Sequence, residues 1–225
     1  MLDMTLLWGS GSCPCWRAMI ALEEKNLQGY NHKLLSFDKM EHKSQQVLDI
    51  NPRGQTPSSR HPRDQQNRPF LHWVSLLQSQ FQNQGNRLIP DAAEERALMY
   101  QRMFEGQSFY EKLNNVIYYD LFVPEEERHA SALSRNKEAL KAELGLWEAH
   151  LQKSPGSFLA GSSFSLADVV VFPTMAYLFR FGLSEGRYPK LGEYYALLKD
   201  RPSIKASWPP HWLENPKGHE ALKDF

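Results

Sequence analysis

The sequence is poor in cysteine, has no excess of charge of either sign and contains no long hydrophobic run. Its two cysteines, Cys13 and Cys15, lie too close together for an easy structural disulfide, which excludes a secreted disulfide scaffold. Lys plus Arg and Asp plus Glu both number 26, so we expect no nucleic-acid partner and no cationic face for a membrane. No stretch approaches the roughly 20 apolar residues of a membrane-spanning helix, and Met1–Trp8 does not resemble a signal peptide. These absences favour a cytoplasmic protein.

Apolar residues are nevertheless plentiful. The 225 residues allow one large domain or two modest ones, and 41% of them are hydrophobic, which is enough for a proper core. Aromatic residues make up 12% of the chain and include six tryptophans, a composition that suits a core and also an apolar ligand cleft.

The N-terminal segment has the pattern of an α/β unit. Met4–Trp8 is a short apolar run that predicts a buried strand, and Gly9–Ser12 predicts a tight turn after it. A helix is expected from Cys13, with Pro14 in its first turn, where proline is well tolerated. Tyr30–Phe37 predicts a second strand, so the chain begins in the order strand, helix, strand.

The region that follows is less regular. Lys43–Leu48 predicts a short polar helix or turn, and the prolines of Asn51–Pro57 predict an irregular loop. Ser58–Pro69 is polar and has no strand period, whereas Phe70–Phe81 has apolar residues at helical spacing. Asn83–Pro90 is expected to be a linker.

The second half of the chain is predicted to be a helical bundle. Ser165 and Asp168 form a capping box at the start of an apolar helix, which is a structural feature. The tail from Ser207 is rich in Pro and Trp and is expected to be irregular. The predicted helices span Ala92–Tyr119, Glu125–Lys153, Val169–Phe181 and Tyr188–Lys199. We therefore expect an α/β domain over residues 1–82 and an all-α domain over residues 91–225.

The segment Gly9–Arg17 is the best candidate for chemistry. It places Ser12 and Cys13 at the start of a helix, where unpaired N–H groups and the helix dipole stabilise an anion. A serine hydroxyl there can donate to a bound thiolate, and a cysteine there would have its own pKa lowered. The alternative is that Ser12 is only a helix cap and that Cys13 is a small buried filler.

This segment resembles the first strand and helix of glutathione transferases, in particular the serine-type classes, and most closely the rho class. The resemblance implies a thioredoxin-like N-terminal domain, with Ser12 in the place of the serine that activates the glutathione sulfur. Cys13 and Pro14 also resemble the omega class, whose active residue is cysteine and which favours mixed-disulfide chemistry.

The resemblance continues through Lys39–Ser44 and Asn51–Pro57, which are similar to the family's loop into its cis-proline. It implies that Pro57 is cis and that the Thr56 backbone pairs with the cysteinyl part of glutathione. It also implies a place near the glycyl carboxylate for His42, Lys43 and Gln55. For Lys43, a solvated polar face is the stronger alternative.

The C-terminal half also resembles this family, through Arg96–Glu105, Phe158–Asp168 and Arg201–Trp212. The resemblance implies an apolar electrophile beside glutathione and a homodimer. Aromatic residues at helical spacing also fit an ordinary core. The candidate residues that would line the electrophile are Phe104, Tyr110, Tyr118 and Trp208.

Residues 57–80 depart from the family pattern. The family has two further strands here and then an acidic residue followed by serine, which binds the γ-glutamyl end of glutathione. Asn67–Pro69 stands about where that pair should be. The abrupt change of composition suggests a frame-shifted stretch or a wrong exon, and transcript sequencing that confirmed these residues would refute that hypothesis. A sheet of two strands would be marginal.

Three functions remain open at this point. The first is a glutathione transferase that detoxifies apolar electrophiles, with glutathione as co-substrate and with no cofactor and no metal site expected. The second is a thiol–disulfide oxidoreductase that uses Cys13. The third is a non-catalytic binding protein of the same fold, because the acidic–Ser pair is missing.

Overall fold

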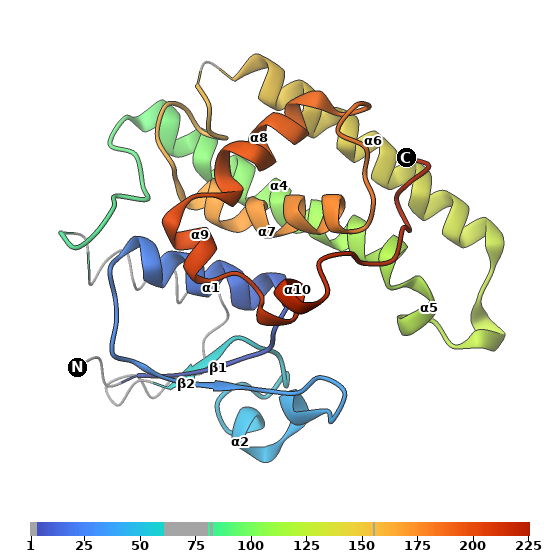
Figure 1. Cartoon of the computed structure of the whole chain (residues 1–225), viewed down its shortest axis with the longest axis horizontal. Helices are drawn as coiled ribbons and strands as arrows, with labels where there is room; N and C mark the ends of the chain where they lie inside the picture. Colours follow the sequence, from blue (N-terminus) through green and yellow to red (C-terminus); the bar gives the residue numbers. More distant parts are fainter. Residues whose placement is uncertain (1–3, 61–80, 82, 155) are drawn as a thin grey trace. The chain divides into compact units, whose positions relative to one another are not determined.

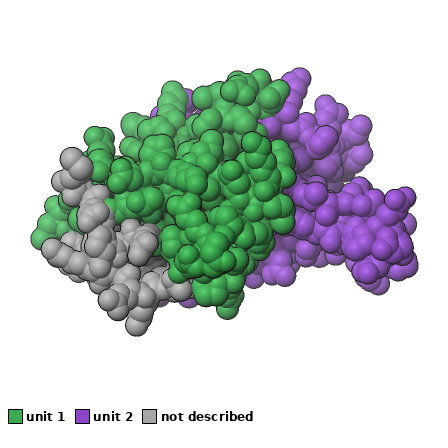
Figure 2. Space-filling view, turned by 90° about the horizontal axis from the view of Figure 1, so that it is seen from below, with its two compact units in different colours: residues 1–88, 202–215 green, residues 89–201, 216–225 purple. Residues whose placement is uncertain are grey.

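The computed structural model describes residues 4–60, 81, 83–154 and 156–225. The chain divides into two units, coloured separately in Figure 2. Unit 1 runs to Leu88 and also takes in Pro202–Asn215 from the far end of the chain. Unit 2 consists of Ile89–Arg201 and Pro216–Phe225. Pro202–Asn215 was expected in the helical domain, whereas the structure groups this segment with unit 1.

Unit 1 is built on a small mixed sheet (Figure 1). Strand β1 (Thr5–Trp8) is central, with β2 (Asn31–Leu34) parallel to it on one side and β3 (Ser58–Arg60) antiparallel on the other. Leu6 lies opposite His32 of β2 and Ser59 of β3. The strand–helix–strand order expected from the sequence is confirmed.

Strand β3 corrects one prediction. The polar stretch from Ser58 was expected to contain no strand, yet the described sheet has three strands rather than two. A strand can be held by its backbone ladder without an apolar period, and the buried Ser58 hydroxyl is satisfied by donating to Gln55 O at 2.7 Å. The helix predicted over Phe70–Phe81 lies outside the described residues, apart from Phe81.

Helix α1 (Cys13–Glu24) follows β1 and begins where the sequence predicts. It buries Trp16, Ile20 and Leu22 almost completely. Two short helical turns follow the second strand, η1 (Glu41–Lys43) and α2 (Gln45–Leu48). Val47 of α2 packs with Leu7 of β1 and Leu35 in a buried apolar cluster.

The C-terminal part of unit 1 is helical, which corrects a second prediction. Helix α9 (Pro202–Ala206) packs against α1, and α10 (Pro210–Glu214) follows it in the tail that was expected to be irregular. Pro210 lies in the first turn of α10, where it is tolerated, and Trp212 is buried. A helix of five residues is too short to show a helical period, so α10 could not be predicted from the hydrophobic pattern.

Unit 2 is all-helical in its described residues, as predicted. Helix α4 packs against α6 and α7, and α8 packs against α6 and α7. Almost every residue of α7 is buried, so it forms the centre of this unit. The elements are α4 (Ala93–Ile117), α5 (Tyr119–Phe122), η2 (Glu125–Glu127), α6 (Ala130–Lys153), α7 (Leu166–Arg180) and α8 (Pro189–Lys199).

The capping box at the start of α7 is confirmed. The fully buried Asp168 carboxylate accepts hydrogen bonds from Ser165 N at 2.8 Å, Leu159 N at 3.0 Å and Tyr194 Oη at 3.0 Å. Burial raises the pKa of this carboxyl, against the opposing effect of these hydrogen bonds. Asp168 therefore has a structural role, as the sequence analysis expected.

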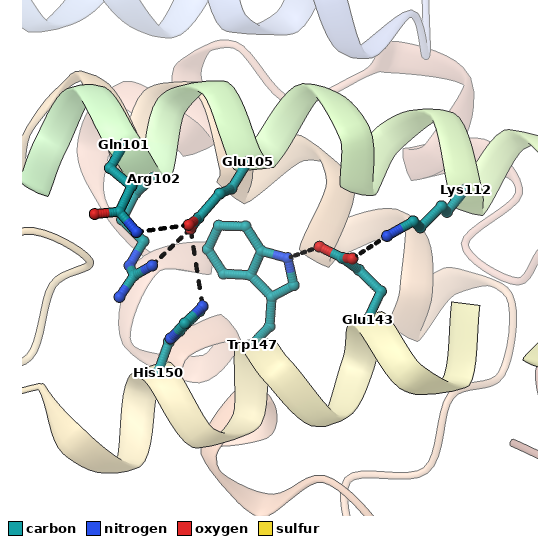
Figure 3. Close-up of polar contacts among 7 residues, drawn as sticks. All are labelled: Gln101, Arg102, Glu105, Lys112, Glu143, Trp147 and His150. Carbon is teal, nitrogen blue, oxygen red and sulfur yellow. Dashed lines mark hydrogen bonds and ion pairs between the residues drawn. The ribbon is translucent and has the colours of Figure 1, made fainter. Parts of the chain in front are cut away.

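Polar side chains join α4 to α6 (Figure 3). The Glu143 carboxylate accepts from Trp147 Nε1 at 2.9 Å and from the Lys112 ammonium. At the other end of the same face, Glu105 pairs with Arg102 at 2.6 Å and with His150 at 3.8 Å. Because Trp147 and Glu143 are buried, this network fixes the register of the two helices.

Candidate active site

The turn from Gly9 to Ser12 connects β1 to α1 and places a hydroxyl at the start of the helix. Ser12 N donates to Gly9 O at 3.2 Å, which closes the turn. Ser12 is the N-cap of α1, and its half-buried side chain accepts from Cys15 N at 3.4 Å. A hydroxyl that accepts through its oxygen can still donate its proton, so Ser12 can offer a hydrogen bond to an anion at this helix end.

Cys13 lies in a different environment from the one expected. Its side chain is fully buried, and burial raises the pKa of its thiol to about 12 despite the nearby Arg17 charge, which lowers it. The expectation that the helix start lowers this pKa is therefore wrong, because desolvation of the thiolate outweighs the favourable charges. Thiol–disulfide exchange needs an accessible thiolate, and Cys13 meets neither condition.

Cys15 was not among the candidate residues, yet its fully buried thiol contacts the turn that presents Ser12. Its sulfur accepts from Gly9 N at 3.4 Å. Burial raises the pKa of this thiol, while hydrogen bonds with the side chains of Ser12 and Thr56 oppose the rise. The structure therefore brings Ser12 and Thr56 together around one buried sulfur, although about forty residues separate them in the sequence.

The loop that carries Thr56 has the predicted geometry. The Thr56–Pro57 peptide bond is cis, which confirms that prediction. Asn51 Nδ2 donates to Gln55 O at 2.9 Å, so the main chain of Gln55 is held from inside the loop while its side chain is exposed. Thr56 and Pro57 are half-buried, so the loop is held in place while part of its surface stays open to a ligand.

His42 and Lys43 lie on η1, beside this loop. Lys43 Nζ donates to Arg53 O at 3.3 Å, and the rest of its side chain is exposed. His42 is half-buried against Phe37, with ring centroids 5.2 Å apart. Burial and the Lys43 charge lower the pKa of His42, so its neutral form is favoured.

The structure divides the four aromatic candidates between the two units. Phe104, Tyr110 and Tyr118 belong to unit 2, whereas Trp208 belongs to unit 1. Since about 3.6 residues make one helical turn, Phe104 and Tyr110 lie on different sides of α4. Phe104 is 59% exposed and Tyr110 is half-buried, so these two do not form one continuous aromatic surface on the helix.

Tyr118 and Trp208 each lie in an aromatic cluster. Tyr118 Oη donates to Tyr177 Oη at 3.4 Å, and its ring lies 6.3 Å from that of Phe181. Trp208 packs edge-on against Trp16 at 5.0 Å and near Trp212 at 6.0 Å. Both side chains are half-buried, so each has a packing role and also an exposed face.

Comparison with known proteins decides the family. Glutathione S-transferase A of the fish Pleuronectes platessa is 64% identical to this chain over 222 residues, which cover 99% of the chain and 98% of the relative. The chain belongs to the glutathione S-transferase family. The family's N-terminal domain matches residues 12–73, and its C-terminal domain matches residues 108–208.

Solved structures agree with this membership. A glutathione S-transferase from the Antarctic clam Laternula elliptica is 33% identical and superposes with a TM-score of 0.86 over 99% of both chains. A glutathione transferase homologue from Sulfitobacter, solved with bound glutathione, superposes with a TM-score of 0.77 over 92% of this chain and 97% of its own. It is 22% identical, so this second match shows the fold alone. The thioredoxin-like domain followed by an all-helical domain is thus confirmed, and the chain is a glutathione transferase enzyme.

Two contacts at the start of α1 were not predicted from the sequence. Cys15 was quoted only as part of a motif, because nothing in the sequence shows that its thiol meets the Thr56 loop. Ser10 and His211 form a hydrogen bond of 2.6 Å between Oγ and Nδ1, although 201 positions separate them.

The region of the missing acidic–Ser pair, residues 61–80, lies outside the described residues. Within the part of the chain that is described, no helix has both the length and the apolar character needed to cross a membrane.

Proposed function

We propose that this transferase binds glutathione in unit 1, with the thiol at the start of α1 and the Ser12 hydroxyl donating a hydrogen bond to the sulfur. The observation that carries the proposal is the half-buried Ser12 hydroxyl at the N-cap of α1, in a chain that is 64% identical to a glutathione S-transferase. A hydroxyl donor and a helix N-terminus both stabilise a thiolate. Membership of the glutathione S-transferase family, shown by a relative that is 64% identical over 99% of this chain, supports glutathione as the ligand.

The reaction follows from that arrangement. The thiol proton leaves to solvent, and the thiolate sulfur attacks an electrophilic carbon to form a carbon–sulfur bond. For an aryl halide, the carbon–halogen bond breaks and halide leaves with its electron pair. Holding the two reactants together supplies much of the rate enhancement.

The remaining contacts to glutathione are assigned by residue type. The Thr56 backbone, before cis-Pro57, pairs with the cysteinyl part of glutathione. Lys43 of η1 offers an exposed ammonium to the glycyl carboxylate. His42 lies beside it on η1, and Gln55 lies in the loop before cis-Pro57. The apolar electrophile contacts exposed aromatic faces, for which Phe104, Tyr110, Tyr118 and Trp208 are the candidates.

We also infer a rho-like class, a homodimer and a cytoplasmic location for this enzyme. The motif Gly9–Arg17 and the closing segment Arg201–Trp212 support the class. Sedimentation of the purified protein tests the dimer, because a dimer should give a measured mass twice that of the chain. Fractionation of the source tissue tests the location.

Paired substitutions at the start of α1 test the assignment of the thiol-activating residue. Ser12→Ala should lower kcat/KM for an activated aryl halide by about 10²-fold, which is typical for loss of one donor to a developing anion. Cys13→Ser should keep most of the activity, because its thiol is buried and protonated. The opposite pattern, with Cys13→Ser inactive and Ser12→Ala unaffected, would assign the chemistry to cysteine.

A further inference from the structure

The C-terminal segment Pro202–Asn215 follows α1 in the opposite direction within unit 1. In Figure 1, α9 and α10 are drawn in red beside the blue α1. Three side-chain contacts lie in order from the end of α1 to the turn before its start. They join Glu24 to Ser203, Trp16 to Ser207, and Ser10 to His211.

The middle of this segment is rigidly anchored. Trp16 Nε1 donates to Ser207 Oγ at 3.1 Å, and both residues are buried. The Trp16 ring also lies edge-on to Trp208 at 5.0 Å and to Trp212 at 5.4 Å. Large aromatic rings packed in this way allow little movement, so α10 holds His211 in a fixed place next to Trp212.

His211 meets the turn that presents Ser12. Ser10 and Gly11 are the central residues of this turn, and Gly11 has a φ of 77°, a conformation that glycine adopts without strain. The Ser10 hydroxyl and His211 Nδ1 lie 2.6 Å apart, so they are hydrogen-bonded whichever of them donates. The turn is thus held from the inside by the bond from Gly9 N to the Cys15 sulfur and from the outside by His211.

We propose that His211 is a positioning residue for glutathione activation: through Ser10 it fixes the Gly9–Ser12 turn and so the direction of the Ser12 hydroxyl. The inference rests on the proposed role of Ser12. Its physical basis is that a hydrogen bond to a thiolate weakens steeply with misalignment, so a turn that moves loses thiolate stabilisation. The segment Pro202–Asn215 therefore helps to position the Ser12 hydroxyl within unit 1.

The test measures the pKa of the glutathione thiol in the binary complex, from the ultraviolet absorbance of the thiolate against pH, together with kcat and KM for an aryl halide. His211→Ala and Ser10→Ala should each raise that thiol pKa and lower kcat about tenfold, within the range expected for a misplaced group. The double variant should be no worse than either single variant, because both remove the same bond. His211→Asn keeps a hydrogen-bonding group near the Nδ1 position and should recover much of the loss.

A matched control is His219→Ala, which removes another exposed histidine from the C-terminal part of the chain. It should leave the thiol pKa and kcat unchanged. If His211→Ala and Ser10→Ala leave the pKa and kcat at wild-type values while Ser12→Ala changes them, the inference about His211 is wrong and the role of Ser12 stands. If wild-type protein shows no glutathione thiolate at all, the proposed function itself fails.

Discussion

Four small polar side chains lie close together at the start of α1 and have different environments. Ser10 is held by His211, Ser12 caps the helix, and Cys13 and Cys15 are fully buried. These hydroxyl and thiol groups are similar in size but differ in their access to solvent. Ser12 is half-buried and can reach a ligand, whereas neither thiol can.

The buried cysteines lead to a prediction about thiol reactivity. Because burial raises the pKa of Cys13 to about 12 and also raises that of Cys15, both thiols are protonated at pH 8. Iodoacetamide should alkylate the folded protein slowly at pH 8 and should alkylate both thiols rapidly after unfolding in urea. Mass spectrometry of the time course measures this difference. Rapid alkylation of Cys13 in the folded protein would contradict the burial and restore the oxidoreductase hypothesis.

At the scale of the elements, close approach of α4 to α7 depends on one glycine. A Cβ atom added at Gly106 would lie 2.7 Å from Val171 Cγ2, which is closer than van der Waals contact allows. Gly145 is a matched position, since it lies inside α6 and nothing is within 4 Å of an added Cβ. Alanine substitutions at these two glycines therefore separate the effect of packing from that of helix propensity.

Gly106→Ala should destabilise the protein by about 1–3 kcal/mol, because overpacking forces the helices apart. Gly145→Ala should stabilise it by about 0.5–1 kcal/mol, because alanine loses less entropy in a helix. Urea unfolding of both variants measures the two free energies. Stabilisation of equal size at both positions would show that α4 and α7 are not in the contact described.

The α4–α6 network in Figure 3 makes stability depend on pH. Burial raises the pKa of Glu105, but hydrogen bonds from Gln101 and Arg102 and the charges of Arg102 and His150 outweigh it, so the pKa is lowered from 4.5. A carboxyl whose pKa is lowered by folding contributes stability above its ordinary pKa, and that contribution is lost as pH falls through the folded value. Glu105 should therefore stabilise the fold at neutral pH and lose this effect in acid.

Glu105→Gln should accordingly lower Tm at pH 7 and have a smaller effect as pH falls below 4.5. Thermal unfolding followed by circular dichroism across that range measures the change. Glu111→Gln, at an exposed position of the same helix, is the control and should give no such trend. A Glu105→Gln effect of constant size at every pH would argue against the ion pairs as its cause.

Short sequence motifs predicted the elements that are determined by interactions between neighbouring residues. The start of α1 followed from the Gly9–Ser12 turn and Pro14, and the capping box at Ser165 located the start of α7. Strand β3 and helix α10 were missed because each depends on tertiary contacts, namely the backbone ladder of β1 and the burial of Trp212. The cis bond at Pro57 came from the family resemblance and not from the residues alone.

At the scale of the whole molecule, the division of the chain does not follow the sequence order. Pro202–Asn215 returns to unit 1, and the last ten residues rejoin unit 2, where Gly218 N donates to Arg180 O at 3.1 Å. The place of Ser12 at the start of α1 could be predicted from the residues, whereas its proposed role toward the glutathione sulfur came from the family resemblance. The approach of Thr56 to Cys15 and the Ser10–His211 bond could not be predicted from the residues alone, because folding over long sequence separations brings these groups together.

The central claim is that this chain binds glutathione and stabilises its thiolate through Ser12. The most direct test is a calorimetric titration of the purified protein with glutathione at neutral pH, repeated in buffers that differ in their heat of ionisation. We predict saturable binding with release of a proton, and a smaller proton release for Ser12→Ala, because the weakened donor leaves more of the bound thiol protonated. No saturable binding at millimolar glutathione would contradict the account and would leave a transferase fold without a working glutathione site.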